Sequence, residues 1–331
     1  MGRLGPGARC PVAGGGRVRA AAVVVNFNSG DDLATCLAAL VAQEPPVEVV
    51  VVDCASTDVS RQVAASPPAG VRSVLLPDNR GYAGGCNAGL AALASAPEVV
   101  GFFNPDCFPE PGYLRACTAV LAQCPRVGGV AGRLLRPGGA VLDSCGQRLT
   151  PILLRVRDRG YGEPAAGAYL DPARVLAACG AAAVFRRRAL EEVAVAGRVF
   201  PDEFFAFWED LDLGWRLTNA GWQVVYEPSA VAVHRRGATA APGRGRLVFR
   251  RSPELAACVI LNRWGTLMRN AHAADLVPRL PLLVAADLAL TVAVAARQPR
   301  VLGALARGLP RLRLAARQRR ALRQRPLRRV A

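Results

Sequence analysis

Short valine-rich runs alternate with longer amphipathic stretches along the first third of the chain. The runs at 20–25, 47–53, 71–77 and 99–103 predict buried strands, and residues 31–41 place leucines at helical spacing. Val-rich strands that alternate with helices form a parallel sheet covered on both faces. The pattern therefore predicts an α/β fold.

Polar side chains stand where these predicted strands end. Asn26 and Asp53 follow the first two strands, Asn79 follows the third, and Asp106 follows the fourth. Ligands of such sheets bind beyond the carboxyl ends of the strands. These four residues are therefore expected to border a ligand site.

The middle of the chain is less regular. Gly, Pro and Arg punctuate residues 130–175, with strands expected near Val141 and Leu153. A strand is predicted at 178–185, followed by a helix through Glu192. Two short strands are predicted at 222–227 and 230–234, because Pro228 interrupts the apolar pattern.

The stretch FFAFWEDLDLGWRL, residues 204–217, embeds three carboxylates in an aromatic and aliphatic run. Its spacing predicts a helix from Glu209 to Gly221, which places Asp210 at the helix mouth. A carboxylate partly shielded from water is a candidate general base. The alternative is an acidic helix end that only offsets the helix dipole.

Charge is segregated along the sequence, and every basic residue is arginine. Residues 1–234 hold 21 arginines and 22 acids, a net charge of −1, whereas residues 235–331 hold 21 arginines and 3 acids, a net charge of +18. Such segregation indicates a polyanionic partner surface, either acidic lipids or nucleic acid.

The basic region favours a membrane surface. Residues 254–271 predict a helix, and residues 276–296 are strongly apolar but interrupted by Pro278, Arg279, Pro281 and Asp287, which leaves too short a run to span a bilayer comfortably. The last segment has leucines on one face and arginines around it, as in helices that lie in a membrane interface. Apolar faces packed on the rest of the protein, with a solvated basic tail, remain the alternative. Nucleic-acid binding is disfavoured, because aromatic residues do not interleave with the arginines.

The ten cysteines form no CxxC pair and no metal-ligand rhythm. Several stand in apolar settings, which indicates reduced core residues of a cytosolic protein rather than a disulfide framework. The Gly-rich, basic residues 1–19 are expected to be flexible and do not form a convincing export signal.

Asp106, preceded by Pro105, is suited to hold a divalent metal against a diphosphate. His234 ends a strand that could border the same site, although a histidine in such a place is often structural. The glycines of GYAGGCNAG permit close approach of a ligand. They lack the GxGxxG order and its placement after the first strand, so a dinucleotide-binding site is disfavoured.

Seven ordered blocks resemble family 2 glycosyltransferases, with the rhamnosyltransferase-like branch as the nearest match. The blocks are VVVNFNSGDDLATCLAAL, VEVVVVDCASTD, PDNRGYAGGCNAGL, FFNPDCFPEPGYL, CGAAAVFRRRALEEV, FFAFWEDLDLGWRLTNAGWQVVYEP and AVAVHRRG. The resemblance implies a GT-A fold over residues 20–237, followed by a basic, helical, membrane-associating region over 238–331. It also implies inverting transfer of a sugar from a nucleotide diphosphate sugar to an acceptor hydroxyl.

The resemblance also implies roles for individual residues. Asp210 would be the base, with Glu209 beside it in the ED pair, and Asp106 with His234 would contact Mg²⁺ or Mn²⁺ and the diphosphate. Asn104 replaces the first acid of the usual DxD, which leaves one fewer carboxylate. The donor site would be lined by Asn26, Asn28, Asp53, Asn79, Arg80, Gly81, Gly84, Gly85, Asn87 and Asn104.

The function expected from sequence is thus a glycosyltransferase at the inner face of the cell membrane. Its donor would be a rhamnose nucleotide and its acceptor a polyprenyl-linked glycan of cell-envelope polysaccharide synthesis, with no nucleic-acid partner. UDP-galactofuranose is the alternative donor. A nucleotide-sugar-binding protein without catalysis is the alternative function, and the presence of Asp106, Asp210 and His234 disfavours it.

Overall fold

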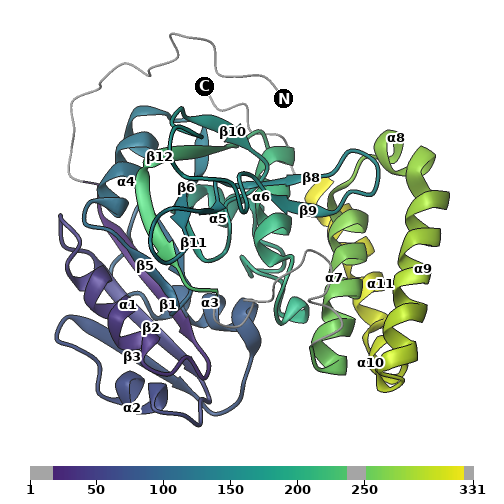
Figure 1. The fold of residues 1–331 in the computed structure, drawn as a ribbon, viewed down its shortest axis with the longest axis horizontal. Helices are drawn as coiled ribbons and strands as arrows, with labels where there is room; N and C mark the ends of the chain where they lie inside the picture. The colour runs from purple at the N-terminus through teal and green to yellow at the C-terminus, as the bar shows by residue number, and fades with distance from the viewer. Residues whose placement is uncertain (1–17, 237–250, 324–331) are drawn as a thin grey trace.

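The computed structural model describes residues 18–236 and 251–323. An α/β part occupies one side of the molecule, and the C-terminal helices stand beside it (Figure 1). Residues 1–17, most of the segment expected to be flexible, and 237–250, which include the expected boundary, lie outside the described residues.

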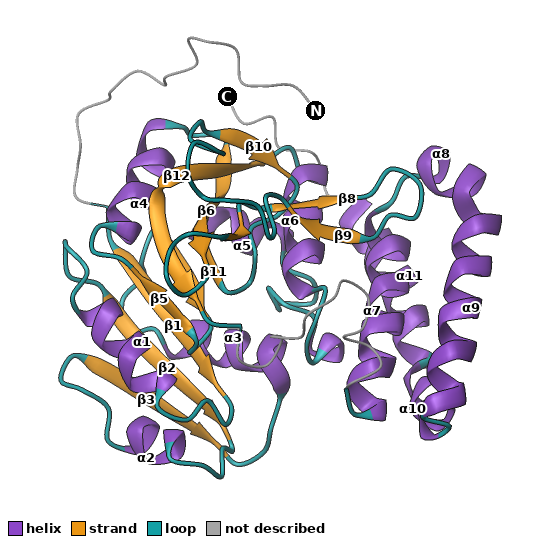
Figure 2. Ribbon diagram, viewed as in Figure 1, coloured by secondary structure: helices purple, strands orange, loops and turns teal. Residues whose placement is uncertain are grey.

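The first half of the sheet follows the sequence pattern. Its four strands are parallel where they pair, in the order β4-β1-β2-β3. Valines of these strands point into cores on both faces of the sheet, where helices cover them (Figure 2). The elements are β1 Ala20–Asn26, α1 Asp32–Val41, β2 Glu48–Cys54, α2 Ser60–Ala65, β3 Val71–Leu76, α3 Gly81–Ala92 and β4 Val99–Phe103.

The second half adds antiparallel pairing. Strand β11 lies between β4 and β6 and is antiparallel to both, and the described sheet continues through β12 to β10. These elements are β5 Cys107–Pro109, α4 Tyr113–Gln123, β6 Val127–Leu135, β7 Leu142–Ser144, β10 Ala173–Val175, β11 Ala182–Arg186, α5 Arg187–Val193, η1 Asp202–Phe204, α6 Glu209–Asn219 and β12 Gln223–His234. A separate hairpin pairs β8 Gln147–Leu149 with β9 Val156–Asp158.

The prediction of two short strands around Pro228 is wrong. The structure has the single strand β12, whose pairing with β6 shifts register between Glu227 and Val231. An irregularity of this kind accommodates a residue that lacks an amide hydrogen. His234 still ends the strand, as expected.

The C-terminal region forms a helical group that packs on the α/β part. The prolines that were expected to interrupt the apolar run stand near the starts of η3 and α9, where a missing amide hydrogen costs little. The elements are α7 Pro253–Asn270, α8 Ala273–Leu276, η3 Val277–Arg279, α9 Leu280–Arg297, α10 Arg300–Gly308 and α11 Pro310–Arg323.

Residues Ala273–Arg297 are long and apolar enough to cross a membrane by length and composition, with a mean hydropathy of 1.8. The expectation that this run is too short is therefore wrong as regards length. Asp287, counted as an interruption, is buried and pairs with Arg263 of α7.

The cysteines fulfil the expectation of reduced core residues with one exception. Eight are free thiols, and seven of these are buried. Cys124 is disulfide-bonded, contrary to the expectation. Cys10 lies outside the described residues.

A buried ion-pair network joins α6 to the C-terminal helices. Asp212 is fully buried and accepts hydrogen bonds from Arg216 Nε at 2.8 Å and Arg269 Nη1 at 2.6 Å. Arg269 also donates to Gln318 Oε1 of α11 at 3.0 Å. Burial alone would raise the pKa of Asp212, but Arg269 and Arg216 hold it below its ordinary value. Asp212 is therefore ionised and anchors the helical group to the sheet.

Asp212→Ala should lower the free energy of unfolding by about 3–5 kcal/mol, because it leaves two buried guanidinium groups without their carboxylate. Urea unfolding measures the change. Glu191→Ala, which removes an exposed i,i+4 partner of Arg187, is the matched control and should change stability by less than about 0.5 kcal/mol. Equal effects of the two substitutions would contradict the anchoring role.

Candidate active site

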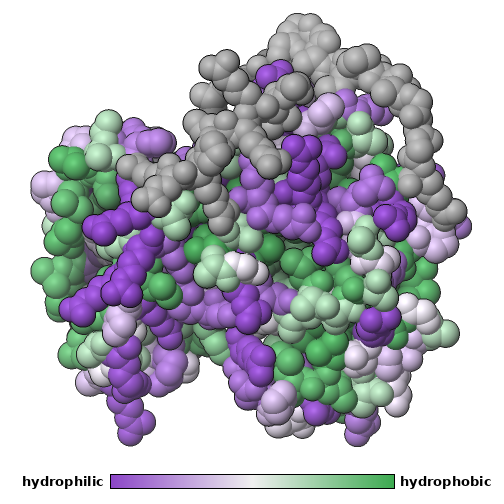
Figure 3. Space-filling view, turned by 180° about the vertical axis from the view of Figure 1, so that it is seen from behind, coloured by the Kyte–Doolittle hydropathy of each residue, from purple (hydrophilic) through white to green (hydrophobic). Residues whose placement is uncertain are grey.

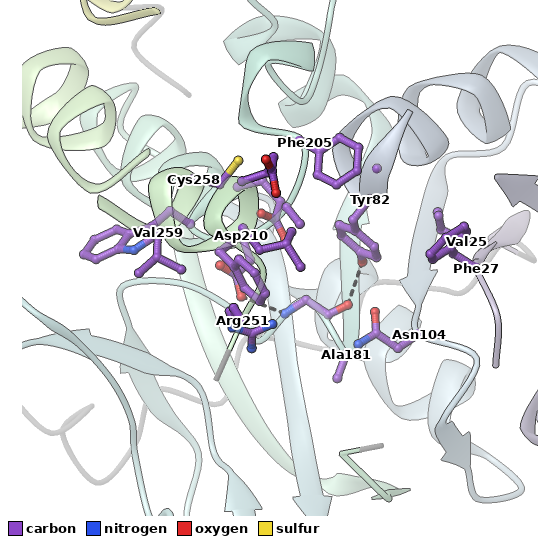
Figure 4. Close-up of a pocket in the computed structure, with 18 of the residues that line it drawn as sticks. Val25, Phe27, Tyr82, Asn104, Ala181, Phe205, Asp210, Arg251, Cys258 and Val259 are labelled. Carbon is purple, nitrogen blue, oxygen red and sulfur yellow. Dashed lines mark hydrogen bonds between the residues drawn. The ribbon is translucent and has the colours of Figure 1, made fainter. Parts of the chain in front are cut away.

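A cavity of about 1310 Å³ lies between the carboxyl ends of the strands and the C-terminal helices. Figure 4 shows its residues converging from both parts of the molecule, with Val25, Phe27 and Asn104 on one side and Cys258 and Val259 on the other. In this view Asp210 lies near Cys258 and Val259, and Tyr82 and Ala181 lie between it and Asn104. The cavity thus borders the end of the sheet where ligands were expected.

Asp210 stands in the first turn of α6 and lines the cavity. Its Oδ2 accepts hydrogen bonds from Gln147 Nε2 at 2.8 Å and from the Gly180 amide at 3.0 Å. Its Oδ1 accepts from the Leu211 amide at 2.7 Å. Burial raises the pKa of Asp210 above its ordinary value, although these hydrogen bonds counteract part of the rise. The side chain is a carboxylate of increased basicity, held in a fixed position on the cavity wall.

Glu209 has a different environment from Asp210. It is 7% exposed, lines the cavity, and its Oε2 has no hydrogen-bond partner among the described residues. Burial, followed by the negative charge of Asp210, raises the pKa of Glu209 well above its ordinary value. A raised pKa favours the protonated form of the carboxyl group, which can donate a hydrogen bond.

Asp106 and His234 meet across the cavity wall. His234 Nε2 lies 3.4 Å from Asp106 Oδ1, and His234 Nδ1 lies 2.8 Å from Asp143 Oδ2. Asp143 is fully buried and also accepts a hydrogen bond from Arg236. Burial lowers the pKa of His234, but Asp106 and Asp143 raise it to about 9. The two residues predicted to share one site are therefore adjacent, although 128 positions separate them.

These residues fit a divalent metal. Two ligands about 2.1 Å from an octahedral ion lie about 3 Å apart, close to the separation of Asp106 Oδ1 and His234 Nε2. Asp143 on the other ring nitrogen provides the outer hydrogen bond that orients metal-bound histidines. In the described residues no group of three or more His, Cys, Asp or Glu side chains could hold an ion, so water and phosphate would complete the coordination.

The predicted donor residues at the ends of the first two strands fall into two sets, those that line the cavity and those that are buried behind it. Asn28 lines the cavity, and its Oδ1 accepts a hydrogen bond from the Thr57 amide at 2.8 Å. Asn26 and Asp53 are fully buried, and Asn26 Nδ2 donates to Asp53 Oδ1 at 2.7 Å. Arg61 also donates to Asp53. In this structure Asn26 and Asp53 are buried beneath the loop that carries Asn28 and do not line the cavity.

In the NRGYAGGCN block, residues 79–87, some of the predicted donor residues line the cavity and others do not. Asn79 and Gly81 line the cavity. Gly81 has φ +67°, and a Cβ there would lie 2.3 Å from the Phe205 carbonyl oxygen, so only glycine fits. Arg80 is exposed and faces Asp78, and Gly84 and Gly85 do not border the cavity but bring α3 close to its neighbours.

The last residue of that block, Asn87, does not line the cavity. Asn87 Nδ2 donates to the Phe200 carbonyl at 2.6 Å and to Asp202 Oδ1 at 2.7 Å. Asn87 Oδ1 accepts from the Phe200 amide at 3.1 Å. These bonds hold the segment that leads to α6 and thus to Asp210. Asn104, by contrast, lines the cavity next to Asp106.

Sequence reasoning missed several residues of this site. Asp143 and Gln147 come from the irregular middle of the chain, and their partners are 91 and 63 positions away. Tyr82 donates its hydroxyl hydrogen to the Gly180 carbonyl at 2.6 Å beside Asp210. Arg236 lies two positions after His234 and donates to Asp158 Oδ2 at 2.9 Å. Only Arg236 carried a sequence signal, its position two residues after the predicted ligand His234.

Comparison with known proteins places the chain among sugar transferases. Residues 21–194 match the profile described as Glycosyl transferase family 2. An N-acetylglucosaminyl-diphospho-decaprenol L-rhamnosyltransferase of Mycobacterium tuberculosis strain H37Rv is 32% identical over 236 residues, which cover 65% of this chain and 75% of that protein. The same protein in strain CDC 1551 matches equally.

Solved structures share the fold at low sequence identity. GalNAc-T7 with UDP, GalNAc and Mn²⁺ has a TM-score of 0.57 and 11% identity, and the match covers 76% of this chain but 48% of that one. S. aureus TarS in complex with UDP-GlcNAc has a TM-score of 0.53, 15% identity, and coverage of 92% and 88%. The mannosyltransferase PcManGT of Pyrobaculum calidifontis with GDP-Man and Mn²⁺ has a TM-score of 0.50, 23% identity, and coverage of 94% and 82%. These likenesses establish a GT-A-like fold.

The carboxyl group of Asp210 should titrate above the ordinary range of aspartate, because its burial disfavours the charged form. Gln147→Leu should raise this pKa further, since it removes a hydrogen bond that favours the charged form. The ¹³C carboxyl resonance, assigned by its loss in Asp210→Asn, measures both values as the pH falls. Gln62→Leu, on the exposed surface of α2, is the control. An ordinary pKa in the wild type would contradict the assignment.

Proposed function

This chain belongs to glycosyl transferase family 2 and is a glycosyltransferase, and from this premise we propose that it transfers L-rhamnose to a hydroxyl of a polyprenyl-linked glycan acceptor. The donor would be a nucleoside diphosphate sugar, and the transfer would invert the anomeric centre. The observation that carries the proposal is the position of Asp210, a basic carboxylate between the strand ends and the helical side of one cavity.

In the proposed reaction, the acceptor hydroxyl attacks the anomeric carbon of the donor from the face opposite the diphosphate. Asp210 takes the proton of this hydroxyl as the new C–O bond forms and the bond to the diphosphate breaks. A single displacement inverts the centre. Gln147, Gly180 and Leu211 keep the carboxylate oriented, so little reorganisation is needed during the step.

Asp106 and His234 would hold a divalent ion, Mg²⁺ or Mn²⁺, at the diphosphate. When bound there, such an ion supplies positive charge opposite the growing negative charge of the leaving group. Asp143 fixes the ring of His234, and Arg236 in turn holds Asp143. The Mn²⁺ in the complexes of GalNAc-T7 and PcManGT supports this assignment.

The choice of sugar and acceptor rests on the Mycobacterium tuberculosis relative, whose name specifies L-rhamnose and a decaprenol-linked acceptor. The nucleotides in the similar structures support a nucleoside diphosphate donor. A role in the assembly of cell-envelope polysaccharide follows from that acceptor class.

We place residues 20–237 in the catalytic domain and residues 238–331 in a region that docks on the cytoplasmic face of the membrane. Six apolar residues of η3 and α9 are between 40% and 63% exposed: Val277, Leu280, Leu282, Val284, Leu288 and Val292. Figure 3 shows hydrophobic residues along the outer edge of the helical region, at the left of that view. An exposed apolar face beside an excess of arginine suits a bilayer with anionic lipids.

Asp210→Asn should reduce sugar transfer by about 10²–10⁴-fold, because the amide cannot accept the proton of the acceptor hydroxyl. Transfer from a nucleoside diphosphate rhamnose to a polyprenyl-linked N-acetylglucosamine measures the loss. Thermal stabilisation by the nucleotide sugar should persist in the variant. Full transfer activity in Asp210→Asn would remove this residue from the role of base.

Asp106→Ala should abolish the additional thermal stabilisation that Mn²⁺ gives in the presence of a nucleoside diphosphate, because one of two protein ligands is lost. The stabilisation by nucleotide without metal should stay. Glu110→Ala, which removes an exposed acid before α4, is the control. The same metal effect in Asp106→Ala and wild type would contradict the metal assignment.

A further inference from the structure

Three arginines of the C-terminal region line the cavity on the side away from the strand ends. Arg251 precedes α7, Arg307 lies on α10 and Arg311 lies on α11. Apolar side chains of the same helices, Leu255, Val259 and Ala304, border the cavity with them. This wall of the cavity therefore combines positive charge with hydrocarbon.

Arg251 lacks a counter-charge in the part of the chain that the structure describes. Its guanidinium stacks on the Phe207 ring at 4.0 Å from the centroid, and its Nε is buried without a hydrogen-bond partner. Burial lowers the pKa of the guanidinium from its ordinary value, which marks a charge held in a partly dry place. A buried donor without a partner is costly unless a ligand supplies one.

The other two arginines are paired only weakly among the described residues. Arg311 Nη1 contacts the Cys258 sulfur at 3.5 Å, and a thiol is a poor acceptor. Arg307 Nη2 lies 3.9 Å from Glu254 Oε1, and both side chains are about two-thirds exposed or more, so water screens the attraction. The positive charge of this wall is consequently available to an anion.

The position of the wall indicates which substrate it serves. The predicted diphosphate contacts of the donor, Asp106 and His234, lie on the side of the strand ends. In Figure 4 Asp210 lies near Cys258 and Val259 of α7 and away from Asn104, which is on the side of the strand ends. A base faces the hydroxyl that it deprotonates, so the helical side of Asp210 is the acceptor side.

The stacked Arg251 is also coupled to the base structurally. Phe207 belongs to the loop that leads into α6, and Asn262 Nδ2 of α7 donates to the carbonyl oxygens of Phe204, Ala206 and Phe207 at 2.7, 2.9 and 2.9 Å. The loop, α7 and Arg251 therefore form one fixed support. An anion bound at Arg251 would be held at a constant position relative to Asp210.

We propose that Arg251, Arg307 and Arg311 form the subsite for the phosphate groups of a prenyl-diphosphate acceptor, with the adjoining apolar side chains contacting its hydrocarbon chain. The proposal rests on the proposed function, and it assigns the acceptor's charged end to residues of this chain. Guanidinium groups suit this ligand, because they bind phosphate oxygens in pairs and tolerate partial burial.

The test uses farnesyl diphosphate as the probe, with the full chain in wild-type form and as Arg251→Gln, Arg311→Gln and the double variant. Each single substitution should weaken binding about 10-fold or more, the effect of one charge-assisted hydrogen bond. Farnesol and inorganic diphosphate should bind more weakly than farnesyl diphosphate. Arg313→Gln removes an exposed arginine of α11 outside the cavity and should change nothing.

Two further measurements separate this subsite from other sources of phosphate. Stabilisation by UDP or dTDP with Mn²⁺ should be unchanged in Arg251→Gln, and a loss of it would assign the arginine to the donor and overturn the proposal. Binding to phosphatidylglycerol vesicles should also be unchanged, and a loss there with intact farnesyl diphosphate binding would assign the arginines to lipid headgroups.

The outcome is independent of whether rhamnose is the sugar transferred. If no rhamnose nucleotide supports transfer but Arg251→Gln still weakens farnesyl diphosphate binding, the subsite stands and the proposed donor falls. If rhamnose transfer proceeds with an unchanged acceptor KM in the double variant, the proposed function stands and the subsite is refuted. Circular dichroism of each variant checks that it is folded.

Discussion

The fully buried carboxylate of Asp212, shared between Arg216 and Arg269, is the interaction on which the rest of this structure depends. A carboxylate out of water is tolerated only when its charge is met by partners of good geometry. Here the partners come from two parts of the chain, so satisfying one charge also joins the helical region to the sheet. The walls of the cavity exist because these two parts meet.

The same helix turn uses its three acids in three ways. Asp212 faces inward and is ionised by its arginines, Glu209 has its pKa raised by burial and by the neighbouring charge of Asp210, and Asp210 faces the cavity with raised basicity. Sequence places them within four positions, and the groups that surround each carboxyl in the fold distinguish them. One short run of acids at a helix N-terminus can thus provide carboxyl groups of different basicity.

Sequence predicts the local elements of this protein well, and predicts its long-range contacts only where chemistry singles out a residue. The strands predicted from the valine runs and the helix that begins at Glu209 are confirmed, because each depends on the periodicity of neighbouring residues in the sequence. Asp106 and His234 could be paired in advance because few residue types bind metal. Asp143 and Gln147 could not be predicted, since their roles depend on contacts with His234 and Asp210, which lie 91 and 63 positions away in the sequence. Asn26 and Asp53 were correctly placed at strand ends, but their mutual hydrogen bond beneath the loop depends on register, which the sequence does not display.

Helix α9 reverses the usual arrangement of a helix in water. Its one acid, Asp287, turns inward to Arg263 together with the buried Leu283 and Val294, while other leucines and valines of the helix are exposed: Leu280, Leu282, Val284, Leu288 and Val292. An exposed apolar surface of this kind marks a site of contact with a membrane or another protein. In dilute buffer without a membrane, the same apolar face of another copy can cover this surface. The purified chain is therefore expected to self-associate as its concentration rises, and mild detergent should reverse the association.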